Sequence, residues 1–246
     1  MAQALTNFST NISPIDFVLI LNNWQLFAWG LLNTLILFLV TTAIGGILAL
    51  PLGVARAYRI RLINPIVLFY TYLFRGTPLL VQTYMLYYGA SEFAFVRDSF
   101  MWPILRESWG CALIAFSINT AAYVTEIVCA GIRSVPSGEV EAAKACGMRP
   151  YTVLRRIVLP GAFRIMLPTY SNEVVFALQA TAVASTITII DVLGAGRTLN
   201  SMFYLAYEGF LTAAAIYVLL TFVVARIFSL LERHLNSHLR PVGEPF

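Results

Sequence analysis

Three charged side chains, Arg75, Glu126 and Glu173, interrupt long apolar stretches of this sequence. A charge surrounded by hydrocarbon is costly, so such a side chain faces a polar cavity or pairs with an opposite charge. A carboxylate in that setting can bind the amino group or another cationic group of a small molecule. We therefore predict that Glu173 binds a cationic group. Glu126 either binds such a group as well or has a structural role between helices.

Arg75 allows two interpretations. It can pair with Glu126, the nearest carboxylate in depth, and hold helices together, or it can bind the carboxylate of a substrate. An unpaired guanidinium in an empty cavity is unfavourable, which favours the structural pair. This interpretation predicts that replacing Arg75 by Ala lowers the yield of an assembled complex.

Uncharged polar side chains accompany these charges. Asn119, Tyr123 and Glu126 are spaced i, i+4 and i+7, so a helix places them on one face. A second polar group surrounds Glu173. Hydroxyl and amide side chains also form hydrogen bonds between membrane helices, and most of the hydroxyls are assigned that role. The candidate substrate-binding residues are Arg75, Asn119, Tyr123, Glu126, Tyr170, Asn172, Glu173 and Gln179.

Glycine and proline occur together in one apolar stretch, in the string F-R-G-T-P-L-L-V-Q from Phe74 to Gln82. Proline has no amide hydrogen and breaks the hydrogen-bond pattern of a helix. Pro78 therefore leaves the carbonyl of Phe74 without its helical partner, and Thr77 or a neighbouring helix must supply a donor. The pattern predicts a helix that is broken near its middle.

A polar segment from Pro136 to Pro160 separates two apolar stretches. Pro136 ends the preceding helix, Ser137 is suited to cap a new helix, and Gly147 is suited to end it. A helix of about two turns is not stable alone in water. It therefore needs a partner surface, either a soluble protein or lipid head groups.

The elements that must position these residues are membrane-spanning helices. Hydrophobic residues make up 59% of the 246 residues and charged residues 11%, whereas soluble domains carry about 25% charged residues. A helix needs about 20 apolar residues to cross a bilayer. The sequence predicts an all-α polytopic membrane protein with five spans, at about 26–55, 64–90, 108–133, 163–190 and 205–231. They form one transmembrane domain over 25–232, with an N-terminal segment at 1–24, a loop at 134–162 and a tail at 233–246.

The distribution of Lys and Arg predicts the orientation. Twelve of them lie at the span ends and loops of one side, and three lie on the other side. Because Lys and Arg accumulate on the cytoplasmic side, we place the N-terminus outside and the C-terminus in the cytoplasm. The net charge of +4 then reflects topology, and nucleic acid binding is not expected.

Catalytic and metal sites are not expected. The two histidines, His234 and His238, both fall in the predicted tail, and the three cysteines are scattered along the chain. Neither a metal-binding spacing nor a disulfide framework results. No Walker A motif G-x-x-x-x-G-K-[ST] occurs, so a nucleotide would have to bind another chain.

The polar segment carries a recognisable spacing: E-A-A, three residues, Gly, nine residues, I-x-L-P. This spacing resembles the cytoplasmic loop of ABC importer permeases, whose short coupling helix seats in a groove on the ATPase. The resemblance implies the type I ABC importer fold and docking on an ATPase dimer that binds ATP and Mg²⁺, with no cofactor in this chain. It implies these ATPase-coupling residues: Glu139, Glu141, Ala142, Ala143, Gly147, Ile157, Leu159 and Pro160.

The string from Phe74 to Gln82 resembles the polar amino acid subfamily of these permeases. Tyr72 stands where many members of that subfamily have an acidic residue, and in this respect the chain resembles histidine-type and opine-type subunits. The resemblance implies a bacterial inner-membrane subunit that takes up polar amino acids, with basic amino acids or opines favoured. It also implies two partners besides the ATPase, a homologous permease subunit in a heterodimer and a periplasmic solute-binding protein. A stand-alone channel or secondary carrier is the alternative.

Two segments near the C-terminus carry weaker expectations. Asp191 to Asn200 contains Gly194 and Gly196, which predicts a bent outer loop that either contacts a soluble partner or is an ordinary turn. The amphipathic tail from Ile227 to Leu239 is expected to continue the fifth span.

Overall fold

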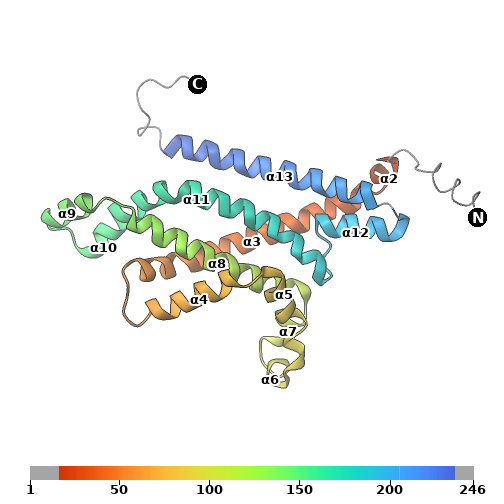
Figure 1. Ribbon diagram of the computed structural model, residues 1–246, viewed down its shortest axis with the longest axis horizontal. Coiled ribbons are helices and arrows are strands. Elements are labelled where there is room, and N and C mark those ends of the chain that lie inside the picture. The colour runs from red at the N-terminus through yellow and green to blue at the C-terminus, as the bar shows by residue number, and fades with distance from the viewer. Residues whose placement is uncertain (1–16, 205, 236–246) are drawn as a thin grey trace, which may run out of the picture.

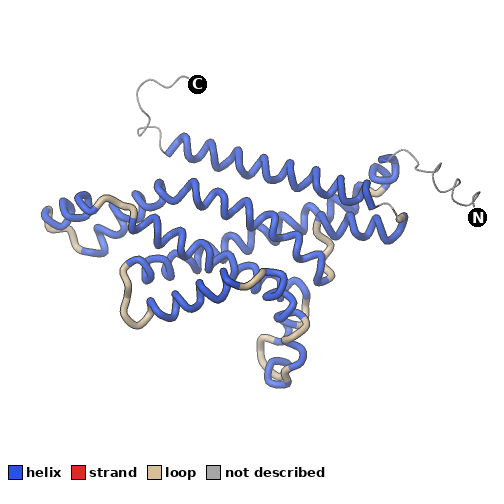
Figure 2. Tube along the Cα trace, viewed as in Figure 1, coloured by secondary structure: helices blue, strands red, loops and turns tan. Residues whose placement is uncertain are grey.

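The computed structural model describes residues 17–204 and 206–235, and these ranges form a bundle of helices (Figures 1 and 2). No strand occurs in the described ranges, so the all-α prediction is confirmed. The predicted N-terminal segment as far as residue 16, and the predicted tail from residue 236, lie outside the described residues. The elements are α2 (Phe17–Asn22), α3 (Trp24–Ala57), α4 (Asn64–Gly76), α5 (Leu79–Tyr87), η1 (Ala90–Glu92), α6 (Ala94–Arg97), α7 (Trp102–Leu105), α8 (Ser108–Arg133), α9 (Ser137–Ala145), α10 (Pro150–Val153), η2 (Leu154–Val158), α11 (Leu159–Ala180), η3 (Thr181–Ile187), α12 (Val192–Phe203) and α13 (Ala206–Leu235).

Long helices run along the length of the molecule (Figure 1). α8 is the most buried of them and packs closely along α3. A Cβ added at Gly45 of α3 would lie 2.8 Å from the side chain of Thr120 of α8, so glycine permits this approach. In the described ranges, four stretches are long and apolar enough to cross a membrane: Trp24–Ala57, Ser108–Arg133, Pro150–Phe203 and Tyr207–Leu235.

The predicted second span, 64–90, consists of two helices. α4 ends at Gly76 and α5 begins at Leu79, and the backbone of Thr77 and Pro78 between them is extended. Pro78 explains the break, because it cannot donate a helical hydrogen bond. Neither helix alone is long enough to cross a bilayer, so the count of five spans stays a prediction.

The predicted fourth span, 163–190, lies inside a longer helical stretch with two irregular turns. The chain passes from α10 through the π-helix η2 into α11, and after Ala180 it tightens into the 3-10 helix η3. η3 ends at Ile187 and is followed by Thr188, whose φ of 70° is left-handed. Irregular turns inside a helix often mark functional sites or hinges. η2 lies against α9. Ala180, where α11 passes into η3, lines the cavity described below.

The expectation of a bent loop from Asp191 to Asn200 is wrong, because this segment begins the helix α12. Asp191 caps α12: its carboxylate accepts hydrogen bonds from the amide of Gly194 at 2.7 Å and from the hydroxyl of Tyr217 at 2.9 Å. An Asp directly before the helix is a start signal that sequence reasoning overlooked. Gly196 has its own packing role, since an added Cβ would lie 2.8 Å from a backbone oxygen of α13.

The two ends of the bundle carry different elements. α9 and the C-terminal end of α13 lie at one end, and α2 and α12 lie at the other (Figure 1). The expected continuation of the fifth span toward the tail is confirmed as far as Leu235, where α13 ends. The polar loop and the C-terminal helix end therefore share one side of the molecule, whereas the orientation of that side in the cell stays a prediction.

Candidate functional site

A cavity of about 370 Å³ lies between α3, α5, α8 and α11. We call it the central cavity. It falls in the size range of pockets that bind small molecules, and its largely apolar walls with a few polar groups are typical of such pockets. Its lining residues are Thr41, Leu79, Phe116, Asn119, Thr120, Tyr123, Glu173, Phe176, Ala177 and Ala180.

Three of the eight candidate substrate-binding residues, Asn119, Tyr123 and Glu173, line the central cavity. The first two come from α8 and the carboxylate comes from α11. Sequence reasoning missed the aromatic wall formed by Phe116 and Phe176. Both could have been found by helical spacing, because Phe176 follows Glu173 by three residues and Phe116 precedes Asn119 by three residues on the same helix face.

Three other candidates, Tyr170, Asn172 and Gln179, do not line the central cavity. The ring of Tyr170 packs against Phe228 of α13, with ring centroids 5.9 Å apart, and lines a separate apolar groove between α3, α11 and α13. Asn172 and Gln179 are exposed. Successive helix residues are rotated by about 100°, so both are turned away from the face that carries Glu173.

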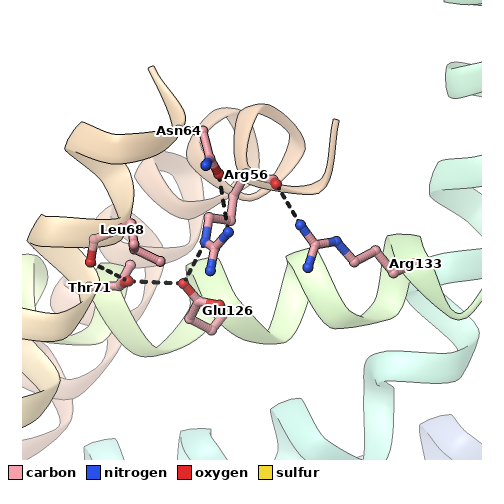
Figure 3. A network of polar contacts seen from close by, with 6 residues as sticks. All are labelled: Arg56, Asn64, Leu68, Thr71, Glu126 and Arg133. Carbon is pink, nitrogen blue, oxygen red and sulfur yellow. Dashed lines mark hydrogen bonds and ion pairs between the residues drawn. The ribbon is translucent and has the colours of Figure 1, made fainter. Parts of the chain in front are cut away.

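The predicted pair of Arg75 and Glu126 is wrong, because Glu126 pairs with Arg56 (Figure 3). Its Oε1 atom accepts hydrogen bonds from Nε of Arg56 at 3.2 Å and from Oγ1 of Thr71 at 2.9 Å. Arg56 also donates to Oδ1 of Asn64 at 3.1 Å. Thr71 is the residue of α4 that lies opposite Glu126, and Arg75 lies one turn further along. Glu126 thus joins α3, α4 and α8 and does not line the central cavity.

Arg75 is exposed and lies beside the central cavity instead. Its guanidinium carbon is 5.2 Å from the centre of the Tyr123 ring, a cation–π contact. The side chain that was expected to hold the bundle together is therefore positioned next to the cavity, where it can meet a negatively charged group.

The break between α4 and α5 is stabilised by side chains. Nε2 of Gln82 donates to the carbonyl of Phe74 at 2.8 Å, and Nδ2 of Asn119 donates to the same carbonyl at 3.2 Å. The carbonyl that Pro78 leaves without a partner thus accepts hydrogen bonds from α5 and from α8. Of the two predicted donors, Thr77 or a neighbouring helix, the neighbouring helix is the one observed. Thr77 bonds elsewhere, to the carbonyl of Leu73. The role of Gln82 was missed, although it follows the proline by four residues.

A second candidate site is α9, in the polar loop. The predicted cap at Ser137 is wrong: the helix begins at Ser137, and Pro136 holds the preceding position without a side-chain hydrogen bond. The predicted end is confirmed, because Gly147 has φ of 76°. The amides of Gly147 and Met148 donate to the carbonyls of Lys144 and Ala143 at 2.9 and 3.2 Å, which is the Schellman arrangement.

The eight candidate ATPase-coupling residues divide into two groups by burial. Ala143 is buried in a core cluster with residues of α8, α10 and α11, and Ile157 and Leu159 pack against the same cluster. These three attach α9 to the ends of the long helices. The others, Glu139, Glu141, Ala142, Gly147 and Pro160, are exposed. Glu139, Glu141 and Ala142 of this exposed group lie on α9, where the small side chain of Ala142 lets another protein approach closely.

Residues 45–237 match one protein family, which is described as binding-protein-dependent transport system inner membrane component. The octopine transport system permease protein OccM of Rhizobium radiobacter is 48% identical, over 85% of this chain and 86% of that protein. The nopaline transport system permease protein NocM of Agrobacterium fabrum is 40% identical, over 92% and 94%. The histidine/lysine/arginine/ornithine transport system permease protein HisM of Escherichia coli K12 is 39% identical, over 86% and 90%.

Solved structures give a similar result. A chain in a crystal structure of an amino acid ABC transporter with histidines matches with a TM-score of 0.80 at 31% identity, over 90% of this chain and 99% of that one. An inward-facing structure of the MetNI methionine ABC transporter matches with a TM-score of 0.67 at 18% identity, a likeness of fold alone. The likenesses extend over most of the chain, including α9.

Proposed function

The chain belongs to the family of binding-protein-dependent transport system inner membrane components, and we propose that its central cavity binds a polar amino acid or opine with a cationic group. The family defines the general role. The chain is a multi-pass permease subunit of an ABC importer, works with an ATPase and a substrate-binding protein, and is not itself an enzyme.

One observation carries the choice of substrate: the carboxylate of Glu173 lines the central cavity, and the guanidinium of Arg75 lies beside it. An amino acid carries an ammonium group and a carboxylate, so we assign its cationic group to Glu173 and its carboxylate to Arg75. The names of the relatives, which refer to octopine, nopaline and basic amino acids, support a cationic substrate.

We further propose that the exposed surface of α9, including Glu139, Glu141 and Ala142, docks on the ATPase, which holds ATP and Mg²⁺. ATP binding closes the ATPase dimer and moves α9. Because Ala143 and Ile157 pack α9 against the ends of α8 and α11, the movement reaches the helices that line the central cavity. ATP thereby shifts the population between inward-facing and outward-facing states through its different affinity for each.

The assembly is proposed on the same basis. Transport sites form where two halves or repeats meet, so a second, homologous permease subunit is expected, in a heterodimer. α4 and α5 together make one crossing, which gives five spans. The excess of Lys and Arg near α9 supports a cytoplasmic position for α9 and the C-terminus and an outside position for the N-terminus.

The proposal is tested by direct binding of radiolabelled arginine and octopine to the purified permease–ATPase complex without the binding protein. Replacing Glu173 by Gln removes one charged hydrogen bond, which contributes about 1.5–3 kcal/mol. The dissociation constant is therefore expected to rise about 10- to 150-fold, with subunit composition unchanged.

Asn172→Ala is the matched control, because Asn172 is the neighbouring residue on α11 and is exposed outside the central cavity. Its dissociation constant is expected to stay at the wild-type value. An unchanged constant in Glu173→Gln would remove Glu173 from the substrate site. Uptake by proteoliposomes that contain no ATPase would instead support the alternative of a stand-alone channel or carrier.

A further inference from the structure

The segment 88–107 between α5 and α8 exposes large apolar side chains outside the helix bundle. Its helices η1, α6 and α7 have three or four residues each. Phe93, Phe95 and Phe100 have 55%, 74% and 89% of their surface exposed. Charged side chains of the same segment, including Glu92 and Arg97, are exposed as well. Rings exposed to this extent need an apolar environment, and this segment alone does not supply one.

The length of α8 fixes the depth of this segment in the membrane. α8 has 26 residues, which corresponds to about 39 Å at 1.5 Å per residue. A bilayer is about 30 Å thick in its hydrocarbon core and about 40–45 Å with the head groups. If α8 crosses the membrane with Arg133 at the boundary next to α9, Ser108 lies at the opposite boundary. The segment ends directly before Ser108, so it lies at that boundary.

Contacts with α8 hold the segment at this depth. The backbone oxygen of Ile104 occupies the space that a Cβ at Gly110 would need, so only glycine fits there. The thiol of Cys111 donates to the carbonyl of Leu105 at 3.1 Å, and its amide donates to that of Glu107 at 3.1 Å. Backbone oxygens of the segment thus meet the first turn of α8.

The direction of the segment is sideways. In Figure 1, α6 and α7 project from the flank of the bundle and do not extend it along its length. The long helices run along that length, which in a membrane is roughly the bilayer normal. A segment that projects from the flank of the bundle runs roughly along the membrane, at the boundary between lipid and water.

From depth, attachment and direction, we propose that the segment 88–107 is an interfacial anchor. Phe95 and Phe100 insert among the lipid chains on the side of the membrane opposite α9, while Glu92 and Arg97 remain in water. Interfacial segments bind lipid in this way, with apolar side chains just below the head groups and charged side chains above them. Tyr88, the first residue of the segment, makes edge-to-face ring contacts with Tyr84 and Tyr87 of α5, and the three rings extend the aromatic band that is typical of this boundary.

Nitroxide labelling of the assembled importer in lipid nanodiscs tests the proposal. In a Cys146→Ser background, labels are attached singly at Phe95→Cys and Phe100→Cys, and at Glu92→Cys and Arg97→Cys as matched controls in the same segment. Cys111 and Cys129 are buried and stay unlabelled. Collision of each label is measured with oxygen, which concentrates in lipid, and with a nickel chelate, which stays in water.

The ratio of oxygen to nickel collisions is expected to exceed one at both phenylalanine positions and to fall below one at both controls. Nickel collisions that dominate at Phe95 and Phe100 would overturn the proposal in favour of an exposed loop. Low collision with both agents would overturn it in favour of a protein partner that covers the rings. Phe100 is 89% exposed, so its replacement removes few contacts. If the Phe95 variant fails to assemble, the label at position 100 still tests the proposal.

Discussion

Glu126 joins three helices through a single carboxylate oxygen, which accepts hydrogen bonds from Arg56 of α3 and Thr71 of α4. Both members of the ion pair are mostly buried, with 17% and 24% of their side chains exposed. Replacing Glu126 by Gln keeps the size but leaves the guanidinium without its counter-charge. Loss of a charged hydrogen bond costs about 1.5–3 kcal/mol. The thermal unfolding midpoint of the purified complex is therefore expected to fall by several degrees.

Glu107 provides a matched control for Glu126. It forms an ion pair with Arg106 at 3.5 Å, but these two side chains are 60% and 65% exposed. Exposed pairs contribute about 0–1 kcal/mol, so Glu107→Gln is expected to leave the midpoint nearly unchanged. Equal midpoints for the two variants would contradict a structural role of Glu126 and would reopen its assignment to a substrate.

At the scale of residues, the sequence identifies which side chains are unusual but not which side chains they meet. Glu173 stands out because a carboxylate interrupts an apolar stretch, and it does line the central cavity. Glu126 stands out for the same reason, but its partner is Arg56 and not Arg75. The choice between the two arginines depends on how α3 and α4 are offset along α8. That offset results from packing over the whole interface, and no local pattern encodes it.

Gly147 determines how α9 ends, and this can be tested at the scale of the element. Its φ of 76° is left-handed, a conformation that a residue with a Cβ adopts at a cost of about 1–2 kcal/mol. An added Cβ would meet no atom within 4 Å, so Gly147→Ala changes the backbone preference alone. If α9 docks on the ATPase, binding of the ATPase is expected to weaken about 5- to 30-fold, measured by titrating the ATPase onto the permease in detergent.

Gly138→Ala is the control for Gly147→Ala. Gly138 lies inside α9, has no left-handed φ, and likewise has open space around it. Alanine favours a helix interior over glycine by about 0.5–1 kcal/mol, so ATPase binding is expected to stay equal or to tighten slightly. Weakening by both variants to the same extent would show that side-chain bulk, and not the conformation at Gly147, disturbs the contact.

Elements bounded by proline and glycine could be predicted from the sequence, and those without such boundaries could not. Pro136 and Gly147 delimit α9, and Pro78 locates the break between α4 and α5. α12 was missed because Gly194 and Gly196 suggest a bend. In the folded chain Gly196 permits close contact with α13. A glycine that serves packing cannot be told from one that serves a turn until its neighbours are known.

At the scale of the whole molecule, the helical class and the shared side of α9 and the end of α13 follow from hydrophobic stretches and charge distribution. The central cavity does not follow from them. It lies where the first residue of α5, after the break at Pro78, and the end of α11, before the 3-10 helix η3, both face α8. A cavity between helices depends on where breaks in different elements come together in space. The sequence indicates each break separately but not how the breaks are placed relative to one another.

The orientation of the whole molecule can be tested at Cys146, without introducing a residue. Of the three cysteines, Cys111 and Cys129 are buried, and Cys146 is exposed at the end of α9. If α9 faces the cytoplasm, a membrane-impermeant maleimide is expected to modify the permease, expressed without its ATPase, in inside-out vesicles and not in right-side-out vesicles. Cys146→Ser is expected to abolish the reaction. Labelling confined to right-side-out vesicles would reverse the orientation and exclude ATPase docking on α9, since ATP is supplied from the cytoplasm.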